Sequence, residues 1–129
     1  MRVLVVDDFM TMRRVVRRLL ADIGIAEVDE AADGAAALEH LRGGAASVDA
    51  VIADIEMPLL GGFGLLSAIK KDAALKHLPV LMVTAEARKD EIVRCVQAGA
   101  AAYLVKPFTR ETLEEKLRQA VPAGFATTS

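Results

Sequence analysis

Five short strand-like runs alternate with five longer segments of helical character, and this alternation constrains the fold more than any other feature of the chain. The strand-like runs cover residues 3–6, 27–31, 49–53, 80–83 and 101–105. The segments that follow them place apolar side chains three and four residues apart, which is helical spacing. They cover residues 11–23, 34–43, 62–71, 88–98 and 110–121. Strands that alternate with helices predict a parallel sheet with helices on both faces.

One strand-like run differs from the others, and this difference predicts the strand order. Residues 27–31 place Val28 among acids, whereas the other runs are mostly apolar on both faces. We therefore expect this second run at an edge of the sheet. The predicted fold is α/β and flavodoxin-like: a five-stranded parallel sheet of order 2-1-3-4-5, with right-handed crossovers and helices on both faces. A closed barrel would need about eight strand-helix units.

Length, charge and cysteine content narrow the class of protein. A chain of 129 residues suits one domain, which we expect at residues 1–121, followed by a short flexible tail at 122–129. The net charge of −2 provides no basic footprint for nucleic acid. The single cysteine, Cys95, excludes an internal disulfide. No apolar run reaches membrane-spanning length and the first is too short for a signal peptide, so we expect a cytoplasmic protein.

Reactive polar residues follow four of the five strand-like runs. Asp7 and Asp8 follow the first run, Asp54 the third, Thr84 the fourth and Lys106 the fifth. The carboxyl ends of parallel strands share one edge, and the switch point between strands 1 and 3 brings the three acids together. A lone acid after a strand is usually a solvated loop residue, but clustering in a cleft favours a functional site.

The three acids predict a metal site. Crowded carboxylates raise one another's pKa values unless a cation joins them, and Mg²⁺ suits a few carboxylates together with waters and a phosphoryl oxygen. The Lys106 ammonium and the Thr84 hydroxyl add groups that neutralise or hydrogen-bond phosphoryl oxygens. Together these residues suit phosphoryl transfer onto Asp54, which would give an aspartyl phosphate.

Four segments carry a resemblance to a known family. They are Val5-Val6-Asp7-Asp8, Asp54-Ile55-Glu56-Met57-Pro58, Val83-Thr84-Ala85 and Lys106-Pro107-Phe108. In this order and spacing they resemble the receiver domain of two-component response regulators, over essentially the whole chain apart from the tail. Further runs are similar to the single-domain chemotaxis regulators of that family. The family is itself a standard example of the 2-1-3-4-5 order, so this order is not an independent result.

The resemblance implies a phosphoacceptor and its metal ligands. Asp54 would accept phosphate from a histidine kinase. Mg²⁺ would be bound directly by Asp8, Asp54 and the backbone carbonyl of Glu56, and through water by Asp7. The family commonly has Asn where Glu56 stands, and we hypothesise that this carboxylate alters metal affinity and the rate of phosphate hydrolysis.

The resemblance also implies a switch and an output face. Thr84 and Lys106 would contact the phosphoryl group, and Tyr103 would swing inward as Thr84 moves toward it. The output face would meet the flagellar motor switch protein or another protein target. Its residues would be Ala87, Lys89, Ile92, Tyr103, Val105, Phe108, Thr109 and Lys116.

Several roles stay open at this point. We expect a monomeric signalling module, not an enzyme, although it would catalyse its own phosphorylation and dephosphorylation. A phosphate sink and a phosphorelay intermediate in another pathway are alternatives to motor control. A Mg²⁺-dependent phosphohydrolase with an aspartate nucleophile fits less well. A flavin carrier of the same sheet order conflicts with Asp7 and Asp8, which would repel a flavin phosphate.

Overall fold

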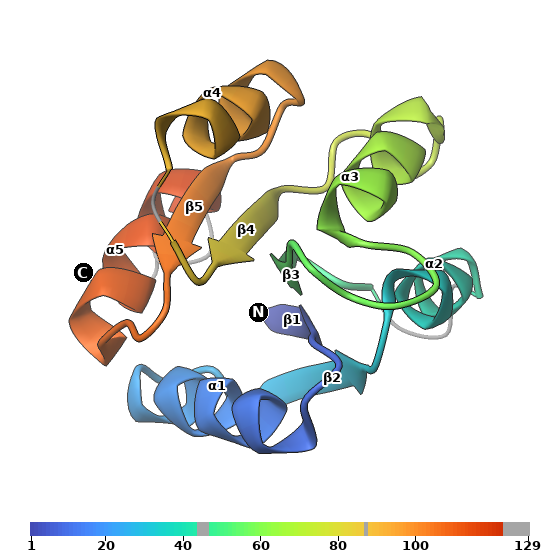
Figure 1. Ribbon diagram of the computed structural model, residues 1–129. Coiled ribbons are helices and arrows are strands. Elements are labelled where there is room, and N and C mark those ends of the chain that lie inside the picture. The colour runs from blue at the N-terminus through green and yellow to red at the C-terminus, as the bar shows by residue number, and fades with distance from the viewer. Residues whose placement is uncertain (44–46, 87, 123–129) are drawn as a thin grey trace.

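The strand-like runs form a single parallel sheet, as Figure 1 shows. The computed structural model describes residues 1–43, 47–86 and 88–122. Within these ranges the strand order is β2-β1-β3-β4-β5, as predicted. The strands are β1 (Arg2–Val6), β2 (Glu27–Ala31), β3 (Ala50–Asp54), β4 (Val80–Thr84) and β5 (Ala102–Val105). The helices are α1 (Met10–Asp22), α2 (Gly34–Arg42), α3 (Gly62–Lys71), α4 (Lys89–Gln97) and α5 (Arg110–Ala120).

The helices cover both faces of the sheet because successive strand side chains point to opposite sides. Val3 and Val5 of β1 belong to a core formed with α1 and α5. Leu4 and Val6, one position along, belong to a second core formed with α2, α3 and α4. The alternation leaves both cores apolar, which is why the central runs show no polar face in the sequence.

The polar second run is an edge strand, as predicted. Strand β2 pairs only with β1 among the described strands, and its register places Ala31 beside Val6. Strand β3 lies on the other side of β1, where Ala53 is beside Val6. This arrangement puts the ends of β1 and β3 next to each other at the switch point.

Close backbone packing holds the loop after β3 near the strand ends. A Cβ atom added to Gly62 would lie 2.6 Å from the carbonyl oxygen of Asp54, so only glycine fits without a shift. The N–H of Gly62 donates to the carbonyl of Ile55 at 2.9 Å. The start of α3 therefore packs directly under the end of β3.

The observed boundaries differ from the predicted ones by a residue or two, as helix ends commonly do. Helix α1 begins at Met10, one residue early, and α5 ends at Ala120, before Pro122. Ala87 and residues 123–129, most of the predicted tail, lie outside the described residues. In the part of the chain that is described, no helix is long and apolar enough to cross a membrane.

Candidate functional site

The polar residues predicted at the strand ends come together at one edge of the sheet. Asp7 directly follows β1, Asp54 ends β3, Thr84 ends β4 and Lys106 directly follows β5. The last three of these residues border a cleft of about 520 Å³. Its lining includes Asp8, Asp54, Glu56, Thr84, Glu86, Arg88, Glu91 and Lys106. The cleft is thus rich in carboxylates, with Arg88 and Lys106 as its cations.

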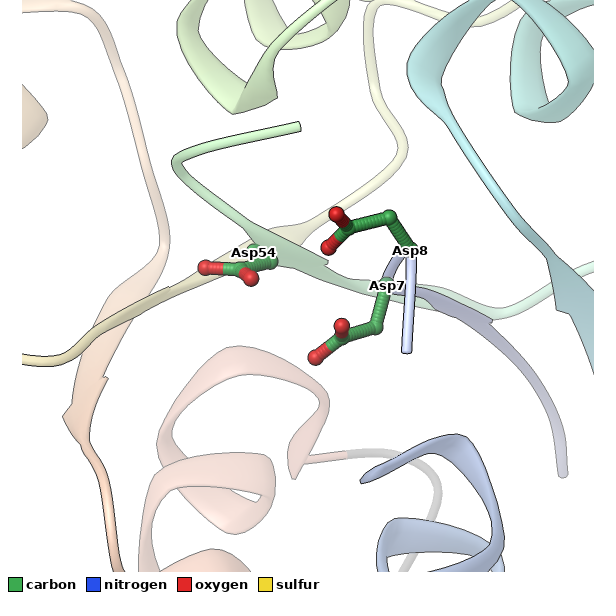
Figure 2. Close-up of side chains that lie close together, drawn as sticks. All are labelled: Asp7, Asp8 and Asp54. Atoms are coloured by element: carbon green, nitrogen blue, oxygen red, sulfur yellow. The ribbon is translucent and has the colours of Figure 1, made fainter. Parts of the chain in front are cut away.

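The three aspartates form one cluster of metal-ligand type. Carboxylate oxygens of Asp7, Asp8 and Asp54 lie within 4.8 Å of one another, and Figure 2 shows the three side chains close together at the strand ends. Asp7 and Asp54 are buried, with 4% and 8% of their surface exposed, whereas Asp8 is exposed. Three carboxylates this close together fit a hard divalent cation such as Mg²⁺. The carbonyl of Glu56 as a further ligand stays a prediction.

Lys106 links two of these acids. Its Nζ lies 3.1 Å from Oδ2 of Asp7 and 3.1 Å from Oδ2 of Asp54. Burial works to lower the pKa of Lys106, but hydrogen bonds and charge from Asp7 and Asp54 outweigh it and the net pKa is raised. The ammonium therefore stays charged beside the acids. The backbone N–H of Phe9 also donates to Asp7, at 2.9 Å.

The carboxylate of Asp54 is buried, and burial disfavours its charged form. Burial raises the pKa of its carboxyl, the charge and hydrogen bond of Lys106 lower it, and the charge of Asp7 raises it again, so that the net shift is upward. A second cation in the cluster would relieve this cost. The electrostatics of Asp54 therefore favour binding of a cation, in agreement with the geometry.

Thr84 lies in the cleft with its hydroxyl already engaged. It is buried, with 7% exposed, and its Oγ1 donates to the carboxylate of Glu91 on α4. Oγ1 also lies 2.8 Å from the carbonyl oxygen of Glu86. Glu91 was not singled out in the sequence analysis, because an acid in the first turn of a helix is usually a solvated residue that interacts favourably with the helix dipole.

Comparison with known proteins decides the family. The model of the response regulator receiver domain family matches residues 3–118. The chain belongs to this family.

Close relatives of this receiver domain carry chemotaxis names. It is 49% identical over 119 residues to "Chemotaxis protein CheY" of Pseudomonas aeruginosa, across 92% of this chain and 94% of that protein. It is 51% identical over 117 residues to "Chemotaxis protein CheY-3" of Vibrio cholerae, across 91% of this chain and 88% of that protein. The receiver domain is thus similar to these proteins over most of their length.

Solved structures agree with the fold. The CheY4 structure of Vibrio cholerae matches with a TM-score of 0.83 at 37% identity, over 92% of this chain and 97% of that chain. A response regulator receiver domain protein from Clostridium thermocellum matches with a TM-score of 0.84 at 31% identity, over 95% of each chain. The two matches confirm the predicted sheet with its flanking helices.

The predicted output residues that the structure describes lie on α4, β5 and α5 and on the loop between the last two. Lys89 is exposed, and Ile92 is half-buried. Tyr103 is half-buried, and the Nζ of Lys116 lies 5.3 Å from the centre of its ring. Thr109 caps α5 by accepting a hydrogen bond from the N–H of Thr112. Val105, Phe108 and Lys116 are half-buried as well. The structure brings Tyr103 and Lys116 together; the role of this face in output stays a prediction.

Proposed function

We propose that Asp54 accepts a phosphoryl group from a histidine kinase in a Mg²⁺-dependent reaction, and that the phosphorylated chain signals by protein contact. The observation that carries the proposal is the convergence of three carboxylates within 4.8 Å beside a lysine that bridges two of them. A carboxylate nucleophile with cations around it suits phosphoryl transfer, in which charge stabilisation and positioning supply most of the catalysis.

Each side chain has a distinct task in this reaction. An Asp54 oxygen forms the new bond to phosphorus, while the bond from phosphorus to the donor histidine nitrogen breaks. The Lys106 ammonium faces the oxygens that carry the transferred charge. Mg²⁺, when bound by Asp8, Asp54 and the carbonyl of Glu56 with Asp7 acting through water, would supply further neutralisation of that charge. The Thr84 hydroxyl would hydrogen-bond one phosphoryl oxygen of the product.

A phosphorylation assay tests the acceptor. Incubation with acetyl phosphate and Mg²⁺ should add one phosphoryl group to the chain, detected by intact-mass spectrometry. The addition should disappear in Asp54→Asn and when EDTA removes Mg²⁺. Asp22→Asn, an exposed acid at the end of α1, serves as the matched control. Phosphorylation of Asp54→Asn at the normal level would contradict the assignment.

We further propose a role in chemotaxis, as a cytoplasmic monomer whose target is a flagellar motor switch protein. Support comes from the relatives of about half identity, which are named as chemotaxis proteins. The predicted output surface would be formed by Lys89, Ile92, Tyr103, Val105, Phe108, Thr109, Lys116 and the undescribed Ala87. Phosphorylation would shift the population toward a state with higher affinity for the target.

A binding experiment separates motor control from the alternative roles. The chain, with Mg²⁺ and with or without beryllofluoride as an acyl-phosphate mimic, would be titrated with a purified motor switch protein. We expect measurable binding only with beryllofluoride. Equal affinity in both states would contradict the proposed output, and absence of binding in both would favour a phosphate sink or a phosphorelay role.

A further inference from the structure

The Thr84 hydroxyl is hydrogen-bonded to a side chain of α4. Its Oγ1 accepts a hydrogen bond from the N–H of Glu86 at 3.2 Å and lies close to two acceptors, the Glu86 carbonyl and the Glu91 carboxylate. A hydroxyl has one proton to donate. The carboxylate is the stronger acceptor, because hydrogen bonds to ionised groups are about twice as strong as neutral ones. We therefore assign the hydrogen bond donated by the Thr84 hydroxyl to the carboxylate of Glu91.

We propose that Glu91 is a positioning residue that holds Thr84 in the unphosphorylated state and competes with the phosphoryl group for its proton. This inference rests on the proposed function, in which Thr84 contacts the phosphoryl group on Asp54. Since Thr84 has a single proton, it cannot donate to both acceptors at once. Each phosphorylation event then requires the bond between Thr84 and Glu91 to break.

The position of Glu91 links the competition for the Thr84 proton to the start of α4. Glu91 lies in the first turn of α4, the helix that also carries Ile92 and Cys95. Cys95 is buried in the core formed with α2 and α3, so α4 is anchored at that point. Release of Thr84 removes a strong contact between β4 and the start of α4. Phosphorylation at the sheet edge would thereby loosen the beginning of the helix on the proposed output surface.

Glu91 also borders the cleft, where its negative charge has a second effect on phosphoryl binding. This effect can be distinguished from the competition for the Thr84 proton. A carboxylate repels a phosphoryl group whether or not Thr84 has a hydroxyl. Competition for the proton disappears when that hydroxyl is removed. A double-mutant cycle between Glu91 and Thr84 therefore separates the two effects.

The test measures binding of beryllofluoride in the presence of Mg²⁺ by fluorine NMR. Glu91→Ala should bind about tenfold more tightly than the native chain, because a hydrogen bond to a charged group no longer has to be broken. In the Thr84→Ala background the same change should alter affinity by less than about twofold. Thr84→Ser keeps the hydroxyl and should restore the large effect of Glu91→Ala.

Glu86→Ala is the matched control. Its carboxylate belongs to the same cleft, but no hydrogen bond between that carboxylate and Thr84 occurs among the residues described. An unchanged affinity in Glu91→Ala, or a gain of equal size in the Thr84→Ala background, would overturn the role of Glu91. If the native chain itself fails to bind beryllofluoride with Mg²⁺, the proposed acceptor site fails, and the inference fails with it.

Discussion

Asp54 combines a chemical task with an energetic cost. Its carboxylate is buried at the end of a central strand and lies beside Asp7, and a single lysine contacts both. Burial, together with the charge of Asp7, raises the pKa of Asp54 more than Lys106 lowers it. Charged groups of this kind persist in folded proteins at sites where a ligand completes the set. The energetic cost of burying the Asp54 carboxylate can therefore be measured, and it supports a functional site at this position.

The first prediction concerns stability without metal. Since the pKa of Asp54 is raised on folding, the metal-free chain loses stability as the pH rises above the unfolded value near 3.8 and through the folded pKa. Asp54→Asn removes this cost and should stabilise the metal-free chain by about 1 kcal/mol at neutral pH. Urea unfolding across a pH series in EDTA would measure it. A gain that remained unchanged well below pH 3.8 would contradict the titration of Asp54 as its cause.

Glu56 carries the second prediction. Its side chain is exposed at the cleft, two residues after Asp54. An extra carboxylate beside the metal and the attacking water should change both Mg²⁺ affinity and the lifetime of the aspartyl phosphate. We expect Glu56→Asn to alter each by severalfold, about 1 kcal/mol of electrostatic interaction. The measurements are a Mg²⁺ titration and the decay of the phosphorylated chain, and no change in either would refute the hypothesis.

At the scale of elements, α1 and β2 are joined by ion pairs centred on Glu30. Arg13 and Arg17, one helical turn apart, both contact its carboxylate, at 2.9 and 2.8 Å. The guanidinium of Arg13 also donates to the carbonyl of Asp7 at 2.7 Å. Helical spacing in the sequence places both arginines on one side of α1, but it does not show that β2 lies within their reach.

The third prediction tests these ion pairs. Burial works to raise the pKa of Glu30, but the hydrogen bonds and charges of Arg13 and Arg17 outweigh it and leave the pKa below 4.5. The stabilisation is therefore present above pH 4.5 and is lost as the pH falls through the folded pKa. Glu30→Gln should cost about 1 kcal/mol at neutral pH, near the upper end for partly exposed pairs. Thermal unfolding at neutral and acidic pH would measure it.

The control for this prediction is Glu115→Gln, an exposed acid of α5. We expect its effect on stability to stay within about 0.5 kcal/mol at every pH, as for most surface substitutions. If Glu30→Gln destabilised the chain equally at neutral pH and far below pH 4.5, lost packing and not lost charge would be the cause.

For the whole molecule, Mg²⁺ binding at the acid cluster would be coupled to folding. A ligand that binds only the folded chain stabilises it by mass action, by about 2.7 kcal/mol at a concentration one hundred times the dissociation constant. The fourth prediction is that Mg²⁺ raises the melting temperature, and that EDTA reverses the rise. Asp8→Ala, which removes an exposed ligand without disturbing Lys106, should abolish it. An equal rise in Asp8→Ala would place the metal elsewhere on the chain.

The sequence by itself determined the parallel sheet and the edge at which the reactive residues meet, whereas the full strand order also rested on the family resemblance. These follow from local patterns: apolar runs on both faces of central strands, helical spacing between them, and polar residues such as Asp54 and Lys106 where the runs end. The edge position of β2 also followed from its polarity. Geometry then converts the ends of parallel strands into one shared edge without further information.

Only the tertiary structure decided how the side chains at that edge are engaged. Lys106 contacts both Asp7 and Asp54, and the Thr84 hydroxyl is directed to Glu91 and not left free for a ligand. These partners are far apart in the chain or belong to different elements. Their contacts depend on side-chain rotamers, burial and competition for a single proton, and none of these can be predicted from a sequence pattern. The positions of the strand ends can thus be predicted from the sequence, whereas the hydrogen bonds and ion pairs of the site depend on the folded structure.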